Sequence, residues 1–329
     1  LNERLNVDIV HLHCPMISWA TPQFHRCIQD IAPVVSSLHG SWLGERDGLL
    51  EASMAKEAAV WANVNDIAIR FTAERYAKFE NIAIRESSIC VANSRATRAD
   101  FESRYNPPPN WDCEVVHWGV DTEMFRPLDI ENEQENRNFT EIRTRFGAVS
   151  PGSKLLLAVG RLAARKGYGT LIRGFSALNK EMPNTKLVIV GRGHLKRRLM
   201  RLAKSLGVGE DITIESSLSF AELAQLYRSS DLVVYPSFYE GQGLIPLEAM
   251  ASGVPVVTVD HGPLPEMVDE SVGALFTMGN IESMASVMKE VLKAGRKKGE
   301  KGRSRVLQKF TYSGNAESFE NIYLEAINR

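Results

Sequence analysis

The sequence lacks any long apolar run, any marked excess of one charge and any closely spaced pair of cysteines. Its apolar runs, such as KLLLAV and DLVVYP, are far too short to cross a bilayer, and no basic leader before an apolar core indicates secretion. A formal net charge of -1 gives no reason to expect a nucleic-acid-binding protein. The 329 residues, 44% of them hydrophobic, fit an ordinary globular protein of about two domains.

The cysteines are scattered and form no C-x-x-C motif, which is typical of reduced thiols in a cytoplasmic protein. Five residues near the N-terminus are of metal-binding types: His11, His13, Cys14, His25 and Cys27. They straddle a predicted strand end and a loop without the close paired spacing that zinc sites favour. We therefore favour buried or cleft-lining side chains over a metal centre, and we expect no metal and no cofactor.

Short apolar runs alternate with longer amphipathic segments along the chain. We predict strands at 7–12, 33–38, 88–92, 114–117, 154–159, 186–190, 211–214, 231–235 and 255–259. We predict helices at 51–86, 95–104, 167–180, 194–206, 220–229, 246–252 and 281–294. This alternation, with strands that are nearly continuous in apolar residues, favours parallel sheets covered by helices.

A polar break between Arg126 and Gly152 separates two predicted α/β domains. We place the N-terminal domain at 1–127 and the C-terminal domain at 128–308. Helical periodicity returns after Tyr312. We expect residues 309–329 to form a helix that packs back toward the N-terminal domain.

Two loops that follow predicted strands of the second domain carry glycines and cations. Gly160, Arg161 and Lys166 follow one strand, and Gly191 and Gly193 follow the next. In open α/β sheets, ligands bind outside the carboxyl ends of the strands. Glycine lets backbone N–H groups approach a ligand, and Arg161 and Lys166 offer positive charge to a diphosphate. A lone cation of this kind is more often solvated, but their convergence on one edge favours a ligand site.

The stretch FYEGQGLIPLEAM, at 238–250, places one carboxylate on each side of a glycine loop. The loop comprises Gly241, Gln242, Gly243 and Leu244. Because Pro246 suits the first turn of a helix, the loop delivers its N–H groups at a helix N-terminus, a natural anion site. Glu240 and Glu248 would repel a phosphate unless they address hydroxyl groups, although Glu248 could also merely compensate the helix dipole. Cations and amides for a diphosphate, with acids for hydroxyls, predict a nucleotide-sugar site.

Several segments together resemble the retaining glycosyltransferases of family 4, which have the GT-B fold. In the second domain they are VGRLAARKGYGTLIRGF, KLVIVGRG and AELAQLYRSSDLVVYPSFYEGQGLIPLEAMASGVPVVTVDHGPLPEMV. In the first domain they are DIVHLH, PVVSSLHG, ICVANSRATRADF and VVHWGVDTEMFRP. The resemblance keeps order and spacing over nearly the whole chain. It implies two Rossmann-like domains that face each other across a cleft.

The resemblance also implies roles for individual residues. Arg161 and Lys166 match the pair that binds the donor diphosphate and stabilises it as the leaving group. Glu240 matches an acid near the transferred sugar, and Glu248 matches an acid at the nucleotide ribose. The glycine loop between the two acids matches the segment whose amides meet sugar and phosphate. His39 matches a histidine at the sugar, although a lone histidine after a strand is more often structural.

The implied reaction transfers a sugar with retention from a nucleoside-diphosphate donor, UDP by default, to a saccharide or glycolipid acceptor. No Asp-x-Asp occurs in the chain, so the usual metal-binding carboxylate pair is missing and we expect a metal-independent route. The implied same-face mechanism makes Glu240 an orienting residue rather than a nucleophile. We expect a cytoplasmic protein, with peripheral contact to the cytoplasmic membrane face as an option that relatives often use.

The sequence departs from the family pattern in several places. Gln242 stands where the family most often has Phe, and Trp118 replaces the usual Asn before Gly119. A serine in IESSLS occupies a usual glycine position near the base pocket, which leaves the donor base open. The sequence begins at what would be a later strand, so we expect an incomplete N-terminal domain without its first strand and glycine-rich loop.

Two other functions stay open at this point. A dehydrogenase of the NAD type would need G-x-G-x-x-G after an early strand, and GRGHLK lacks the third glycine. A truncated, non-catalytic chain that binds nucleotide sugars or serves as a partner subunit is favoured only by the missing N-terminal segment.

Overall fold

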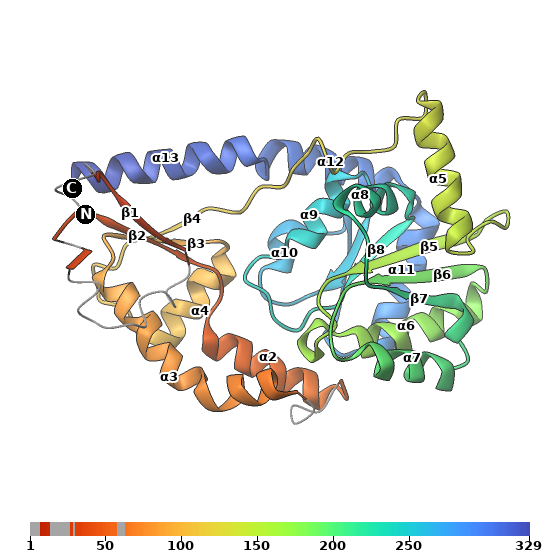
Figure 1. Ribbon diagram of the computed structural model, residues 1–329, viewed down its shortest axis with the longest axis horizontal. Helices are drawn as coiled ribbons and strands as arrows, with labels where there is room; N and C mark the ends of the chain where they lie inside the picture. Colours follow the sequence, from red (N-terminus) through yellow and green to blue (C-terminus); the bar gives the residue numbers. More distant parts are fainter. Residues whose placement is uncertain (1–6, 14–26, 29, 58–62) are drawn as a thin grey trace.

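The computed structural model describes residues 7–13, 27–28, 30–57 and 63–329. Two α/β domains lie side by side, and the long helix α13 runs from the C-terminal domain along the N-terminal sheet (Figure 1). Of the helices in the described part of the chain, none combines the length and apolar character needed to cross a bilayer.

The N-terminal domain is built on a parallel sheet in the order β1-β2-β3-β4. Its strands are β1 (Val10–His13), β2 (Val34–Leu38), β3 (Ile89–Ala92) and β4 (Cys113–Val115). Its helices are α2 (Trp42–Met54), α3 (Val64–Glu86) and α4 (Arg95–Tyr105). Because side chains alternate between the faces of a strand, Leu38 packs with Phe101 of α4 on one face, whereas Val35 packs with Ile322 of α13 on the other.

The prediction of a single helix over 51–86 is wrong, because α2 and α3 are separate helices. Residues 58–62 between them lie outside the described part of the chain. The helix α2 ends before Lys56, whose φ of 61° is a left-handed conformation that a right-handed helix cannot continue. The helix α3 starts where the side chain of Asn63 caps its first N–H groups.

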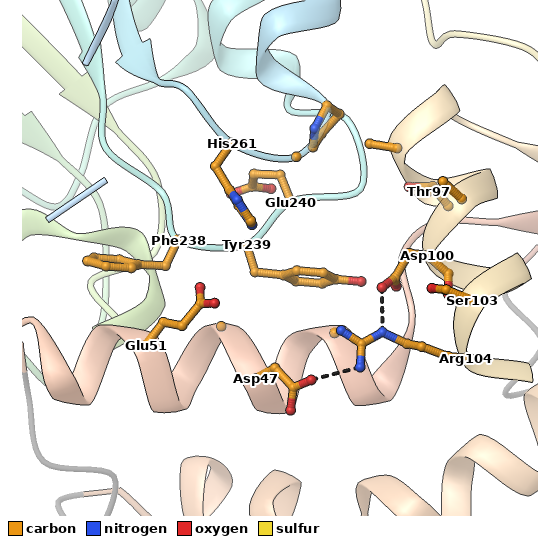
Figure 2. A pocket seen from close by; sticks show the side chains of 16 residues that line it. Asp47, Glu51, Thr97, Asp100, Ser103, Arg104, Phe238, Tyr239, Glu240 and His261 are labelled. Atoms are coloured by element: carbon orange, nitrogen blue, oxygen red, sulfur yellow. Dashed lines mark hydrogen bonds and ion pairs between the residues drawn. The ribbon is translucent and has the colours of Figure 1, made fainter. Parts of the chain in front are cut away.

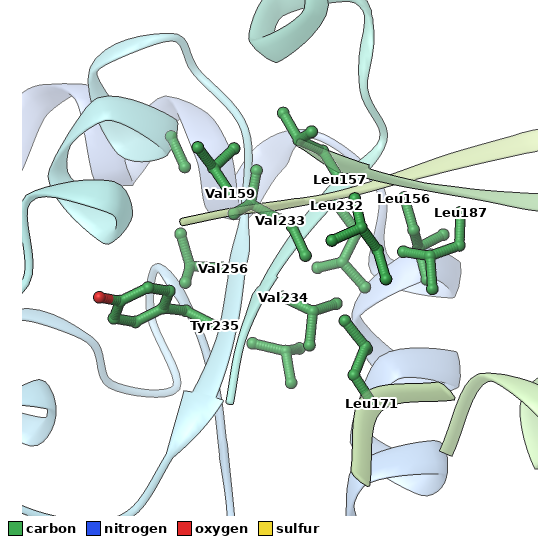
Figure 3. Close-up of a cluster of buried hydrophobic side chains, with 14 of the residues drawn as sticks. Leu156, Leu157, Val159, Leu171, Leu187, Leu232, Val233, Val234, Tyr235 and Val256 are labelled. Atoms are coloured by element: carbon green, nitrogen blue, oxygen red, sulfur yellow. The ribbon is translucent and has the colours of Figure 1, made fainter. Parts of the chain in front are cut away.

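The C-terminal domain has a six-stranded parallel sheet in the order β10-β9-β8-β5-β6-β7. Its strands are β5 (Lys154–Val159), β6 (Thr185–Val190), β7 (Ile212–Glu215), β8 (Leu232–Tyr235), β9 (Val256–Val259) and β10 (Gly273–Phe276). Buried aliphatic side chains fill its centre, among them Leu156, Leu187 and Val233 (Figure 3). Every strand predicted from the sequence is present; the additional edge strand β10 is short and half covered, so its pattern is weak.

Helices cover both faces of this second sheet (Figure 1). They are α5 (Glu133–Arg145), α6 (Tyr168–Glu181), α7 (Lys196–Ser205), α8 (Phe220–Ser229), α9 (Leu244–Ala251), α10 (Leu264–Met267), α11 (Ile281–Ala294) and α12 (Lys297–Lys309), followed by α13 (Tyr312–Asn328). Two 3₁₀ turns, η3 (Ala164–Lys166) and η4 (Gly209–Asp211), lie in loops. The predicted helix at 246–252 therefore begins two residues earlier, at Leu244.

Each domain supplies a carboxylate that binds the N-terminal turn of a helix in the other domain. Glu57, which is buried, accepts hydrogen bonds from the backbone N–H (2.5 Å) and the hydroxyl (2.7 Å) of Thr170 in α6. Glu266 accepts from the N–H groups of Arg95 (3.0 Å) and Ala96 (2.8 Å) in α4. A carboxylate at a helix N-terminus satisfies unpaired donors and the positive end of the dipole. These two contacts hold the domains against each other around the cleft.

Candidate functional site

The carboxyl ends of β5, β6 and β8 meet where the strand order reverses, since β6 and β8 lie on opposite sides of β5. Such a switch point is where open α/β sheets bind ligands. The loops after β5 and β6 approach so closely that a Cβ on Gly191 would lie 1.9 Å from the Gly160 oxygen. A Cβ on Gly193 would lie 2.4 Å from the Leu162 oxygen. Glycine at 191 and 193 is therefore required by the packing of these two loops.

Lys166 and Glu240 form an ion pair at this switch point, with little of either side chain exposed. Glu240 Oε1 also accepts hydrogen bonds from the hydroxyls of Tyr235 and Ser237, each at 2.6 Å. Lys166 Nζ donates to the Tyr235 hydroxyl oxygen at 3.2 Å. The pair joins the loop after β5 to the loop after β8 and fixes a carboxylate in the wall of the cleft.

The charge of Glu240 is set by the cations around it. Burial opposes ionisation, but the positive charges of Lys166 and Arg165 outweigh it and hold the pKa of Glu240 below its usual range. Glu240 is therefore ionised at neutral pH. Arg165 itself pairs with Glu45 of α2 at 2.9 Å, so the loop after β5 binds an acid from each domain.

Arg161 lies in different surroundings from Lys166. Its exposed side chain lines a cavity of about 310 Å³ together with Arg192 and with Asp66 of α3. The Arg165–Glu45 ion pair lines this cavity and also the one that contains Glu240. Arg161 therefore lines a different cavity from Glu240, the partner of Lys166, and the Arg165–Glu45 pair lines both cavities.

His39 follows β2 and lines, together with Glu240, a cavity of about 210 Å³. Its ring centroid lies 4.8 Å from that of Trp118 and 6.0 Å from that of His13. Burial and the nearby His13 lower the pKa of His39 to about 4, so the imidazole is neutral at pH 7. Its Nδ1 is buried and has no hydrogen-bond partner in the described part of the chain. A neutral ring with an unused nitrogen is suited to bind a substrate hydroxyl.

The helix α9 starts directly after Gly243, whose φ is 95°. Its first turn starts at Leu244, which is 37% exposed, and contains Pro246, whose missing N–H would have had no partner there. Glu248 in the following turn accepts a hydrogen bond from the Tyr227 hydroxyl at 2.6 Å. Burial raises the pKa of Glu248 although the Tyr227 hydrogen bond partly offsets it.

The loop before α9 is bound to the N-terminal domain. The carbonyl oxygen of Gly241 accepts from the hydroxyls of Ser94 (2.6 Å) and Thr97 (2.9 Å) at the start of α4. The amide of Gln242, which is 1% exposed, pairs with the backbone of Trp118. The predicted donor loop therefore lies between both domains.

Tyr239, beside Glu240, is an interface residue that sequence reasoning missed. It occupies a groove left by three glycines, since a Cβ on Gly40, Gly44 or Gly48 would lie within 2.9 Å of a Tyr239 side-chain atom. Its hydroxyl accepts from the Ser41 N–H at 2.6 Å and donates to the Ser41 carbonyl oxygen at 3.1 Å. The four-residue spacing of these glycines is the sequence pattern from which the groove could have been predicted.

A larger cavity of about 430 Å³ lies between α2, α4 and the loops after β8 and β9 (Figure 2). Arg104 lies between Asp47 (2.7 Å) and Asp100 (2.5 Å), which bind its guanidinium. Glu51 and Glu240 line the same cavity. Because its cation is already paired with two acids, this wall suits hydroxyl groups better than phosphate.

The structure brings His39, Glu240 and Gly241 to one cavity, and Lys166 reaches it through its ion pair with Glu240. Arg161 lines the neighbouring cavity of about 310 Å³, and Glu248 accepts a hydrogen bond from the Tyr227 hydroxyl. Arg165 belongs to the same loop as the two predicted cations, but no role was predicted for it, and nothing in the sequence alone reveals its pairing with Glu45.

Three of the five candidate metal ligands near the N-terminus lie in the described part of the chain. Cys14 and His25 lie outside the described part of the chain. His11 hydrogen-bonds through Nε2 to Ser37 (2.7 Å) and through Nδ1 to Tyr323 of α13 (2.6 Å). Both ring nitrogens of His11 are therefore engaged within the protein.

Solved structures with the same fold support this architecture. Sucrose-phosphate synthase from Thermosynechococcus elongatus superposes with a TM-score of 0.76 at 20% identity, over 98% of this chain and 75% of that protein. HepE of Anabaena in complex with UDP superposes with a TM-score of 0.74 at 18% identity, over 97% of this chain and 79% of that one. The prediction of a GT-B fold with two Rossmann-like domains is confirmed.

Curated relatives match over much of the chain. A glycosyltransferase of Methanocaldococcus jannaschii is 30% identical over 82% of this chain and 62% of its own length. A D-inositol 3-phosphate glycosyltransferase of Segniliparus rotundus is 29% identical over 75% of this chain and 54% of its own length. The aligned part therefore spans little more than half of the length of these relatives.

Two family models match in sequence order. Residues 1–124 match the model described as Glycosyltransferase Family 4, and residues 140–305 match the model described as Glycosyl transferases group 1. The second match alone covers just over half of the chain, and the two together confirm the resemblance seen in the sequence. The chain therefore belongs to the glycosyl transferases group 1 family, with an N-terminal part of the family 4 type.

Proposed function

We propose that the chain transfers a sugar from a nucleoside-diphosphate sugar to a saccharide or lipid-linked acceptor, with retention of the anomeric configuration. The observation that carries this proposal is the ionised Glu240, which Lys166 fixes at the same cavity between the two domains that the neutral His39 lines. A carboxylate and an imidazole that line one cavity can both orient the hydroxyls of one sugar.

The proposed reaction breaks the bond between the anomeric carbon and the donor phosphate oxygen, and the electron pair leaves with the nucleoside diphosphate. The acceptor oxygen forms its bond on the same face and gives its proton to the departing phosphate. Arg161 and Lys166 would stabilise the charge that develops on that phosphate. Glu240 would position the sugar, and Glu248 would bind the ribose.

The donor is proposed as a UDP sugar, used without a metal ion. Support comes from names of similar proteins: HepE is solved with UDP-glucose, whereas one mycobacterial relative is named a GDP-mannose-dependent mannosyltransferase. Thermal stabilisation by UDP-, GDP- and ADP-sugars, with and without a chelator, would decide between these bases, because a ligand that binds the native state raises the melting temperature. The largest shift with a GDP or ADP sugar would replace UDP as the donor base.

Transfer or donor hydrolysis by the purified chain tests the activity itself. Glu240→Ala and Lys166→Ala should each abolish most of the turnover, whereas Glu317→Ala on the exposed surface of α13 should leave it unchanged. Unchanged turnover in the first two variants would show that the site is wrongly assigned.

The second candidate is a non-catalytic protein or partner subunit that binds nucleotide sugars. The alignment spans 54% to 62% of the length of the first two relatives, so the activity of the whole protein stays a proposal. A donor that raises the melting temperature but is neither hydrolysed nor transferred would support it. Restored turnover after adding the N-terminal segment of a relative would return the proposal to catalysis. A cytoplasmic location and peripheral membrane contact stay predictions, which fractionation of cells would check.

A further inference from the structure

Two departures from the family pattern, Gln242 and Trp118, lie in contact across the domain interface. Trp118 donates its backbone N–H to Gln242 Oε1 at 2.6 Å, and Gln242 Nε2 donates to the Trp118 carbonyl oxygen at 3.1 Å. The side-chain amide thus pairs with the backbone as a neighbouring strand would. A phenylalanine at 242 could make neither bond.

The surroundings leave this amide no other role in the described part of the chain. Gln242 is 1% exposed, and among the described residues its one further side-chain hydrogen-bond contact is with Met267 Sδ at 4.0 Å. Without the side chain of Gln242, the Trp118 N–H and carbonyl would lose these partners at the interface. A buried polar group without a partner is unfavourable, so the loop around Trp118 would shift to find water.

Trp118 also contacts His39 at the candidate sugar site. The Trp118 ring lies 4.8 Å from the ring of His39. On the other side, Gly241 is so close to His39 that an added Cβ would lie 2.0 Å from the His39 carbonyl oxygen. Gly241 therefore contacts His39 directly, and Gln242 contacts it indirectly through the backbone and ring of Trp118.

We propose that Gln242 is a positioning residue, which holds Trp118 in place so that the Trp118 ring fixes the imidazole of His39 at the transferred sugar. The inference rests on the proposed function for its catalytic consequence. This role differs from simply holding the two domains together, because it acts through the contact between the rings of Trp118 and His39, which Trp118→Ala removes by itself.

The first test is kinetic. Gln242→Ala should lower kcat by about 10- to 100-fold, the range that small misplacements of a reacting group produce, with little change in KM for the donor. Trp118→Ala removes the ring but keeps the backbone groups that pair with Gln242, and it should lower kcat similarly. In the double variant the effects should not multiply, because both act through one contact. Gln134→Ala, on the exposed surface of α5, is the matched control with no expected effect.

Gln242→Glu separates positioning from simple loss of packing. A protonated carboxyl can accept from the Trp118 N–H and donate to its carbonyl, as the amide does, whereas an ionised carboxylate has no donor. Burial raises the pKa of such a carboxyl. Activity relative to the wild type should therefore fall as the pH rises through that pKa and recover as the pH falls. Gln242→Ala should show no such recovery.

The ionisable groups near position 242 do not provide this titration by themselves. His117 precedes Trp118 and hydrogen-bonds to Glu266 at 3.0 Å, and Glu266 precedes Met267. Arg305 donates to the Met267 carbonyl oxygen at 2.9 Å. These groups are present in the wild type and in every variant, so the ratio of variant to wild-type activity isolates the introduced carboxyl.

A readout without turnover keeps the inference testable if the chain transfers no sugar. The imidazole resonances of His39, assigned by their loss in His39→Gln, should shift in Gln242→Ala and in Trp118→Ala, but not in Gln134→Ala. A wild type without turnover contradicts the proposed function alone. Unshifted His39 resonances, multiplicative effects in the double variant, or a Gln242→Glu activity ratio that ignores pH would overturn the positioning role.

Discussion

Glu240 and Glu248 belong to one short loop and helix, yet the protein places them in opposite electrostatic environments. Glu240 is surrounded by donors and by a lysine, and its pKa lies below the ordinary value of 4.5. Glu248 has the Tyr227 hydroxyl as the one side-chain donor found in the described part of the chain, and burial raises its pKa above the same value. Similar burial therefore gives opposite shifts of the pKa.

The difference comes from the loop after β5 rather than from the segment that holds the acids. Lys166 and Arg165 project toward the end of β8, where Glu240 lies, whereas α9 carries Glu248 toward α8. A carboxylate with paired cations is a permanent charge that can orient a ligand. A carboxyl with a raised pKa takes full charge more readily when a ligand supplies further donors. Each of the following variants changes one side of this contrast.

The largest effect is expected for Lys166→Met, which would make the surroundings of Glu240 resemble those of Glu248. Removing one partner of a buried ion pair costs about 3–5 kcal/mol, and Arg165 should reduce that loss. Turnover should fall about 100- to 1,000-fold, as for other groups that stabilise developing charge. Steady-state kinetics and urea unfolding measure the two effects. Lys301→Met, on the exposed surface of α12, is the control. If Lys166→Met were as stable and as active as this control, the Lys166–Glu240 pair would contribute neither to stability nor to turnover.

Glu240→Gln is expected to have the next largest effect. It keeps the size of the side chain but removes its charge, so kcat should fall about 100-fold. Because the pKa of Glu240 is lowered in the folded state, its ionisation stabilises the protein above pH 4.5, and this contribution is lost as the pH falls through the lowered pKa. The stability difference between wild type and variant should therefore shrink on acidification, as urea unfolding at several pH values would show. A difference that stays constant between neutral and acid pH would refute the assignment.

Glu248→Gln should act mainly on donor affinity and with the opposite effect on stability. A raised pKa means that the folded state resists ionisation, so the wild type loses stability as the pH rises above 4.5. The glutamine variant should thus be at least as stable as the wild type at pH 7. Losing a charged acceptor for ribose hydroxyls should weaken donor binding about 10- to 100-fold. Titration of the nucleoside diphosphate by calorimetry checks this; unchanged affinity would remove Glu248 from the ribose.

The sequence predicts the architecture well because buried parallel strands leave continuous apolar runs. It also predicts which loops reach the switch point, since glycines and cations follow those strands. It does not predict pairing between loops. The ion pair of Arg165 with Glu45 joins residues 120 positions apart, and neither residue carries a local signal for its partner.

The domain interface shows the same limit. Glu57 caps a helix 113 positions away, and the preceding Lys56 lies where the single predicted helix over 51–86 is broken. Tyr239 requires the bare helix face made by Gly44 and Gly48. Such contacts depend on how two finished domains meet, a tertiary effect that local propensity cannot encode. Of these interface contacts, only the groove for Tyr239 has a pattern in the local sequence, which is the glycine spacing.

Tyr227→Phe is the smallest and most selective change, because it leaves both carboxyl groups in place. It removes the hydroxyl that donates to Glu248 Oε2 at 2.6 Å, and a net cost of about 1 kcal/mol in the free energy of unfolding is expected. The pKa of Glu248 should rise further, since this hydrogen bond is what opposes burial. Glu240 should keep its ionisation, because its donors are Lys166 and the residues of the β8 loop. Turnover at saturating donor should therefore match the wild type, while donor affinity falls a few-fold at low pH and recovers as the pH rises above the raised pKa of Glu248. A loss in kcat as large as the loss in donor affinity would mean that the two carboxyl groups are coupled through the sheet and do not act as separate halves of the site.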